Sequence, residues 1–224
     1  MTVINGQTGS PVRRKSRWRV ITFFGAAFIL AGLGLLGYVS WQYFGTNIVS
    51  KQKQAMIKKD VTAEWSRGID GNTIGLLRIP RLGKDYEAPI VPGFDPTALA
   101  KGVGSYPKGA KPGEIGNFAI AGHRVTHGEL FRDFLKLRKG DKIVVETRTK
   151  IFTYKLRDNG TDRTLDFTVG WPLTSNPIDR NFIPTKPILT MLTCSELFHT
   201  RNRNVVFGDL VSTAEKSSKV LEGS

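Results

Sequence analysis

The chain contains a single cysteine in 224 residues, Cys194, so it has no cysteine pair for an internal disulfide. It also lacks internal repeats, low-complexity tracts, zinc-finger spacing and RNA-binding signatures. Acidic residues are few, with 19 Asp and Glu against 33 Lys and Arg, which gives a net charge of +14. This balance favours an anionic partner or surface, and the missing signatures argue against nucleic acid as that partner.

Charge is also missing from one long stretch, ITFFGAAFILAGLGLLGYVSWQYF, between Ile21 and Phe44. About 20 apolar residues of helix cross a bilayer, and aromatic residues at both ends are typical of membrane interfaces. We therefore predict a transmembrane signal anchor at 20–44. A cleaved signal peptide is the main alternative, but the run is long and no clear small-x-small cleavage site follows it. A buried helix of a soluble protein is the other.

The cationic residues around this segment predict its orientation. Five of them, at 13–15, 17 and 19, immediately precede it, whereas the lysines on the far side begin only at Lys51. The denser cluster predicts a cytoplasmic N-terminal tail at 1–19. A helix-permissive juxtamembrane linker at 45–67, which could lie on the membrane surface, would then lead to an extracellular domain at 68–212 and a C-terminal tail at 213–224. An unpaired cysteine in an exported domain is exposed to oxidation and is a candidate reactive group.

From about Gly68 onward, short apolar runs alternate with Gly, Pro and Asp. Such runs are typical of β-strands, and eight are expected, at 73–80, 88–90, 116–122, 141–147, 151–157, 164–169, 187–194 and 204–211. Helical spacing is seen at 129–137, and a short helical turn is expected at 96–102. Many short strands with few helices predict an all-β domain, as one antiparallel barrel or sandwich.

Three residues with useful chemistry lie at the ends of expected strands: His123, Cys194 and Arg203. If the last two strands pair antiparallel, Arg203 returns to the level of Cys194, and His123 joins them if its strand ends at the same rim. A thiolate can attack a carbonyl, an imidazole can transfer protons, and a guanidinium can stabilise an oxyanion.

Other interpretations of these residues remain open. Cys194 could be a buried inert thiol and His123 a structural histidine. A zinc site could use His123, His127 and Cys194. Against zinc, the segment HRVTH lacks the glutamate of H-E-x-x-H sites, and Arg124 would place a cation beside the metal. We expect no metal or cofactor.

At these residues the sequence resembles the sortases, the membrane-anchored cysteine transpeptidases of Gram-positive envelopes. LTMLTC (189–194) resembles their TLxTC signature, and GNFAIAGHRVTHGELFRDFLKLRKGD (116–141) resembles their histidine segment. LLRIPRLG (76–83) and GVGSYPKGAKPGE (102–114) resemble their first strand and the loop that follows. The AGHRxTHG motif and the spacing of nine residues between Cys194 and Arg203 are most similar to class E, the housekeeping-type sortases of actinobacteria.

This resemblance implies an eight-stranded β-barrel in which Cys194 is the nucleophile, His123 the general acid and base, and Arg203 the substrate-positioning or oxyanion group. Arg201 is the rival for the arginine role, and His127 and Thr193 would lie near the bound substrate. The implied reaction cleaves an LPxTG- or LAxTG-like sorting signal after threonine and joins the protein, through a thioacyl-enzyme, to an amine of a peptidoglycan precursor. The implied partners are surface proteins with such signals, the wall precursor and membrane lipid.

Two alternatives to this function are a degenerate barrel that only binds sorting peptides or cell wall, and a sortase that joins pilins through lysine.

One departure from the resemblance concerns the subclass and the acceptor. Class E sequences commonly carry His-Pro after the cysteine, whereas this chain carries Ser195 and Glu196. A carboxylate at that position would disfavour a thiolate if it pointed inward.

Overall fold

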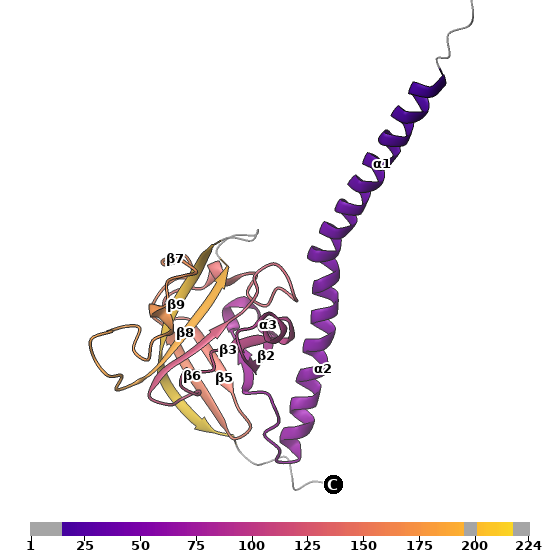
Figure 1. Ribbon diagram of the computed structural model, residues 1–224. Helices are drawn as coiled ribbons and strands as arrows, with labels where there is room; N and C mark the ends of the chain where they lie inside the picture. Colours follow the sequence, from indigo (N-terminus) through magenta and orange to yellow (C-terminus); the bar gives the residue numbers. More distant parts are fainter. Residues whose placement is uncertain (1–14, 195–200, 217–224) are drawn as a thin grey trace, which may run out of the picture. The chain divides into compact units, whose positions relative to one another are not determined.

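The computed structural model describes residues 15–194 and 201–216, which fall into two compact units that divide between Gln42 and Tyr43 (Figure 1). The first unit holds helix α1 (Lys15–Ser40). Its segment Trp18–Ser40 has a mean hydropathy of 2.2 and is long and apolar enough to cross a membrane. The expected N-terminal apolar helix is therefore confirmed. A π-helical turn, η1 (Trp41–Gly45), spans the division.

The second unit is built around a closed β-barrel (Figure 1). Eight strands form the ring in the order β6-β5-β1-β2-β3-β4-β8-β9, and β9 pairs with β6 to close it, while β7 lies outside the ring and pairs with β9. The strands are β1 (Gly75–Arg78), β2 (Glu87–Pro92), β3 (Val103–Ser105), β4 (Gly116–Ala121), β5 (Lys142–Glu146), β6 (Lys150–Leu156), β7 (Thr164–Asp166), β8 (Pro187–Cys194) and β9 (Asn202–Glu215). The predicted all-β barrel is confirmed.

Two pairings correct the prediction of an antiparallel sheet. Strand β2 runs parallel to β3, and β4 runs parallel to β8 over its whole length, from Gly116 opposite Pro187 to Ala121 opposite Leu192. Parallel neighbours need a crossover rather than a hairpin. The chain from β4 to β8 makes a long crossover that contains β5, β6 and β7.

Two local expectations were wrong and one was right. Strand β3 was not predicted, because a three-residue strand with a central glycine carries no alternating pattern. The helix expected at 129–137 is a series of turns followed by the short 3-10 helix η3 (Phe134–Lys136). The helical turn expected at 96–102 is confirmed as α3 (Pro96–Lys101), whose first turn is capped by the Asp95 carboxylate. The other 3-10 helices are η2 (Pro80–Leu82) and η4 (Trp171–Leu173).

The barrel interior is packed with apolar side chains. Strand β6 shows how the sequence specifies this, because Phe152, Tyr154 and Leu156 are buried and alternate with the more exposed Thr153 and Lys155. A continuous cluster of buried side chains runs through the barrel and includes Leu77, Phe118, Ile143 and Leu189. This core holds the strand ends in a fixed relation to one another.

Helix α2 (Thr46–Ser66) lies in the same compact unit as the barrel and contacts α3 and β2 (Figure 1). It ends at Ser66, and Gly68, two residues further on, has a φ of +76° that suits the left-handed position after a helix. Its C-terminal half is tied to the barrel by Lys58, whose Nζ lies 3.9 Å from Glu87, and by Trp65, whose ring lies 4.5 Å below the Lys216 ammonium.

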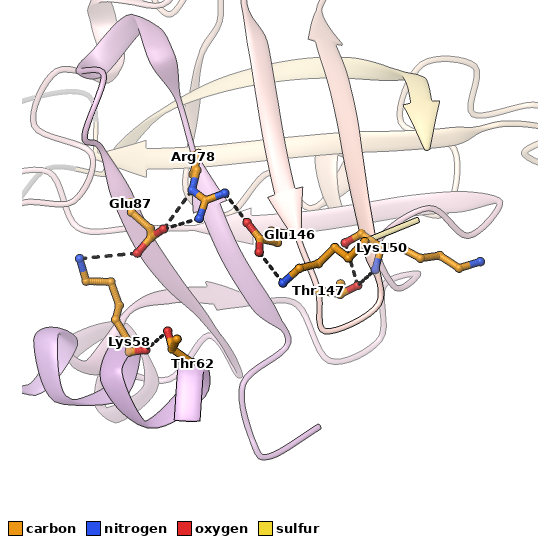
Figure 2. A network of polar contacts seen from close by, with 8 residues as sticks. Lys58, Thr62, Arg78, Glu87, Glu146, Thr147 and Lys150 are labelled. Carbon is orange, nitrogen blue, oxygen red and sulfur yellow. Dashed lines mark hydrogen bonds and ion pairs between the residues drawn. The ribbon is translucent and has the colours of Figure 1, made fainter. Parts of the chain in front are cut away.

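A chain of ion pairs continues from Glu87 across the barrel wall (Figure 2). Arg78 binds Glu87 at 2.7 Å and also binds Glu146, and Lys216 binds Glu146 at 2.6 Å. The network joins α2, β2, β1 and β5 to the residue that follows β9. Helix α2 is thus anchored to the barrel through charged groups as well as through the buried Val61.

Candidate active site

Cys194 is the last residue of β8, and its partner across the antiparallel pairing with β9 is Arg203. The same register pairs Thr193 with Asn204 and Leu192 with Val205. Partner positions of an antiparallel pair share one face of the sheet. The expected return of Arg203 to the level of Cys194 is present in the backbone register.

Strand β4 brings the histidine segment to the same end of β8. The parallel register continues one residue past Ala121, since the Gly122 amide donates to the carbonyl of Leu192 at 3.2 Å. The buried Thr193 hydroxyl donates back to the carbonyl of Gly122 at 2.9 Å. His123 therefore follows β4 directly beside the end of β8, and Thr193 is a bridge between the two strands.

Gly122 is required at this point by close packing. A Cβ there would lie 2.8 Å from the ring of Phe131, which is fully buried. The Phe131 amide donates to the carbonyl of His123 at 2.9 Å and closes the loop that begins with the histidine. The sequence of glycine, histidine and a buried aromatic eight residues later thus determines where the His123 backbone lies.

The imidazole rings of His123 and His127 stack, with centroids 4.6 Å apart and an interplanar angle of 27°. Burial, and secondarily the positive charge of Lys53, lower the pKa of His127 below its ordinary value. The Nδ1 atom of His127 is buried without a hydrogen-bond partner in the described part of the chain. His127 is therefore held as the neutral imidazole near pH 7 beside His123.

The two arginines expected near the site have different surroundings. Arg201 is largely exposed, pairs with Asp166 at 3.1 Å and lies over the ring of Phe167 at 5.4 Å. Arg203 is half-buried, and its Nη1 donates to the carbonyl of Asn202 at 2.9 Å. Its position opposite Cys194 distinguishes it from Arg201, which is engaged at the edge with β7.

The outer face of β8 carries a buried polar bridge. The Thr190 hydroxyl donates to Asn117 Oδ1 at 2.6 Å, and Asn117 Nδ2 donates to the carbonyls of Pro172 and Thr174 at 2.8 Å each. Residues an even number of positions apart on a strand face the same side of the sheet, so Thr190 and Cys194, four positions apart, are on one face. The turn around η4 is thereby held on the face of β8 that carries the cysteine position.

Sequence reasoning missed the helix α2 side chains that contact the histidine loop. Asn47 and Gln54 are polar residues on a charged helix, and nothing in local hydrophobic periodicity marks them as buried. The expectation for Ser195 and Glu196 concerns residues outside the described ranges.

Comparison with known proteins gives a consistent family match. The Sortase domain family matches residues 77–211. Over 216 residues the chain is 33% identical to Sortase SrtE1 of Streptomyces coelicolor, a match that covers 86% of this chain and 58% of that protein's length. Over 232 residues it is 28% identical to Sortase SrtE2 of the same organism, covering 93% and 89% of the two chains.

Solved structures agree with these matches. Sortase E from Streptomyces avermitilis is similar with a TM-score of 0.58 and 34% identity, over 65% of this chain and 91% of that one. Sortase E1 from Streptomyces coelicolor, solved with a tripeptide in its active site, is similar with a TM-score of 0.55 and 34% identity, over 68% and 96%. The described Cys, His and Arg positions all lie within the matched range 77–211.

Proposed function

Since this chain belongs to the sortase family, we propose that it is a membrane-anchored cysteine transpeptidase that acts on proteins with a C-terminal sorting signal. The observation that carries the proposal is the backbone register of β8. Cys194 is opposite Arg203 on one side, and β4 ends beside it with His123 on the other. This register supports the proposed roles of Cys194 as nucleophile, His123 as proton carrier and Arg203 as fixed cation at one end of the barrel.

In the proposed first step, the Cys194 thiolate attacks the threonine carbonyl carbon of an LPxTG- or LAxTG-like signal. A C–S bond forms, and the carbonyl oxygen becomes an oxyanion next to the Arg203 guanidinium, which is always charged. The C–N bond then breaks as protonated His123 gives its proton to the leaving glycine amine. The product is a thioacyl-enzyme. The similar sortase E1, solved with a tripeptide in its active site, supports the proposal that this chain also binds a peptide.

In the proposed second step, an amine of a peptidoglycan precursor attacks the thioester carbonyl. His123 accepts the proton of the incoming amine, the new C–N bond forms, and Cys194 leaves as the thiolate. The neutral state of His127 supports this cycle, because a second positive charge stacked 4.6 Å from His123 would oppose its protonation.

The other three residues receive subsidiary roles in the proposal. Thr193 keeps β8 and the start of the histidine loop in register through its bond to Gly122. His127 lines the site beside His123. Arg201, with its guanidinium at Asp166, lies at the edge of the bound peptide rather than at the reacting carbonyl.

The proposed localisation is a single-pass membrane protein with its N-terminus in the cytoplasm and the barrel outside the cell membrane. The apolar segment Trp18–Ser40 supports the anchor. The cationic cluster that precedes it supports the orientation, since positive residues are retained on the cytoplasmic side. This location puts the barrel within reach of envelope substrates.

The test uses the full chain in detergent micelles with fluorogenic LPxTG and LAxTG peptides and intact-mass detection of the thioacyl adduct. Wild type is expected to cleave the peptide and form the adduct, and Cys194→Ala to do neither. Full activity of Cys194→Ala would contradict the proposal. Binding of the peptide without an adduct would indicate the degenerate barrel, and loss of activity with a chelator would indicate the zinc alternative.

A further inference from the structure

One face of helix α2 carries buried polar side chains. Asn47, Ser50 and Gln54 are spaced three and four residues apart and are 8%, 3% and 5% exposed. Residues at this spacing lie on one side of a helix. Burial of polar groups is costly unless they are hydrogen-bonded, and the partners of two of these side chains belong to the loop that begins with His123.

Asn47 makes three hydrogen bonds to this loop. Its Oδ1 accepts from the Gly128 amide at 2.8 Å, and its Nδ2 donates to the Glu129 carboxylate at 3.0 Å and to the Val125 carbonyl at 3.3 Å. Both the oxygen and the nitrogen of the Asn47 amide are hydrogen-bonded, and their partners lie at both ends of the segment 125–129. The contact is therefore specific for the amide of asparagine.

Gln54 binds the same loop at His127, the residue before Gly128. Its Nε2 donates to the His127 carbonyl at 3.0 Å. The helix and the loop are so close here that a Cβ on Gly128 would lie 2.6 Å from Gln54 Nε2. The φ of +90° at Gly128 favours glycine here, and a larger residue would also displace the end of the Gln54 side chain.

The clamped backbone has an unfavourable local conformation. His127, Gly128 and Glu129 have φ values of +53°, +90° and +55°, so three consecutive residues are left-handed and two of them are not glycine. Each non-glycine residue in this region costs about 1–2 kcal/mol. Such a conformation persists where surrounding contacts determine it, and the contacts here come from Asn47 and Gln54.

We propose that helix α2 is a positioning element of the active site, in which Asn47 and Gln54 hold the 125–129 backbone so that the His127 ring supports the His123 imidazole in its reactive orientation. The connection runs from Gln54 to the His127 carbonyl, and from the His127 ring to the stacked His123 ring. This inference rests on the proposed transpeptidase function. It makes the segment that leads out of the membrane anchor a part of the catalytic unit.

The test compares Asn47→Ala and Gln54→Ala with Gln52→Ala in the full-length protein. Gln52 is an exposed glutamine on the same helix and serves as the matched control. Both positioning variants are expected to lose kcat by about tenfold or more, with KM for the sorting peptide within about twofold, because misplacement of a reacting group lowers the rate of the chemical step. Gln52→Ala is expected to match wild type.

Hydrogen exchange measured by mass spectrometry provides a readout that does not need activity. Peptides covering 123–131 should exchange faster in Asn47→Ala and Gln54→Ala, while peptides from β5 and β6 stay unchanged. Wild-type exchange in the loop, a uniform increase over the whole barrel, or faster loop exchange with unchanged kcat would each overturn the inference. A wild-type protein that forms no thioacyl adduct would contradict the proposed function, and loop exchange would then still decide whether α2 holds the loop.

Discussion

Cys194 and Arg203 are direct partners in the antiparallel pairing of β8 with β9, so two residues nine positions apart in the sequence lie opposite each other on adjacent strands. Changing Arg203 to Lys should lower kcat/KM by about a hundredfold, because lysine keeps the charge but lacks the planar fork of donors. The cleavage rate of the fluorogenic peptide measures this.

Arg201→Lys is the matched comparison, since Arg201 lies two residues away and pairs with Asp166. Its exposed ion pair contributes little, so the variant should stay within about threefold of wild type. A dead Arg201→Lys with a nearly normal Arg203→Lys would reverse the assignment of the two arginines.

The lowered pKa of His127 can be tested with Lys53→Gln. Removal of the lysine charge should raise the pKa of His127 only part of the way, because burial is the larger cause. Nuclear magnetic resonance titration of the imidazole signals measures it, with Lys59→Gln on the exposed side of α2 as the control. An unchanged or lower pKa in Lys53→Gln would contradict the interpretation.

The same shift has a defined effect on stability. Above the unfolded-state pKa of about 6.5, the imidazole is neutral in both states. Below it, the unfolded chain binds a proton before folded His127 does, so the free energy of unfolding falls as the pH decreases through this value. In Lys53→Gln, the part of this decrease that comes from His127 should be smaller.

Asn117 should be a major source of stability for the turn around η4. Asn117→Ala removes the side chain that bonds Thr190 and the carbonyls of Pro172 and Thr174, all at a site 2% exposed. The free energy of unfolding in urea should fall by about 3 kcal/mol, since buried polar groups lose their partners. Asn181 is exposed and lies, like η4, in the connection between β7 and β8. Asn181→Ala should therefore change the free energy of unfolding by less than about 0.5 kcal/mol.

The ion-pair network of Figure 2 predicts a further stability effect. Arg78→Met leaves the 8%-exposed Glu146 with Lys216 as its remaining ion-pair partner in the described part of the chain, and removes the arginine that binds Glu87. The loss should be about 2 kcal/mol, less than for a fully buried pair because Arg78 itself is partly exposed. Lys136→Met, which breaks an exposed pair with Asp133, should be nearly neutral in the same urea titration. Equal losses in both variants would contradict the special role of Arg78.

The local sequence was sufficient to predict where most strands lie, but not which strands pair with one another. Alternation of apolar residues predicts β6, and continuous apolar runs predict β4 and β8, because these patterns belong to single segments. Helical spacing at 129–137 was misleading, since Phe131, Phe134 and Leu137 are buried there by the barrel rather than by a helix face. The parallel pairing of β4 with β8 depends on a crossover of more than sixty residues, which no local pattern records.

The sequence by itself determined the apolar anchor helix, the all-β barrel and the family, together with the candidates Cys194, His123 and Arg203. Each of these follows from composition, periodicity or a contiguous motif. Only the tertiary structure placed Arg203 opposite Cys194 and Arg201 beside Asp166, and showed that Asn47 and Gln54 bind the His127 turn. These contacts join residues more than seventy positions apart or depend on strand register, and the hydrogen bonds that bury a polar side chain leave no trace in hydrophobic patterning.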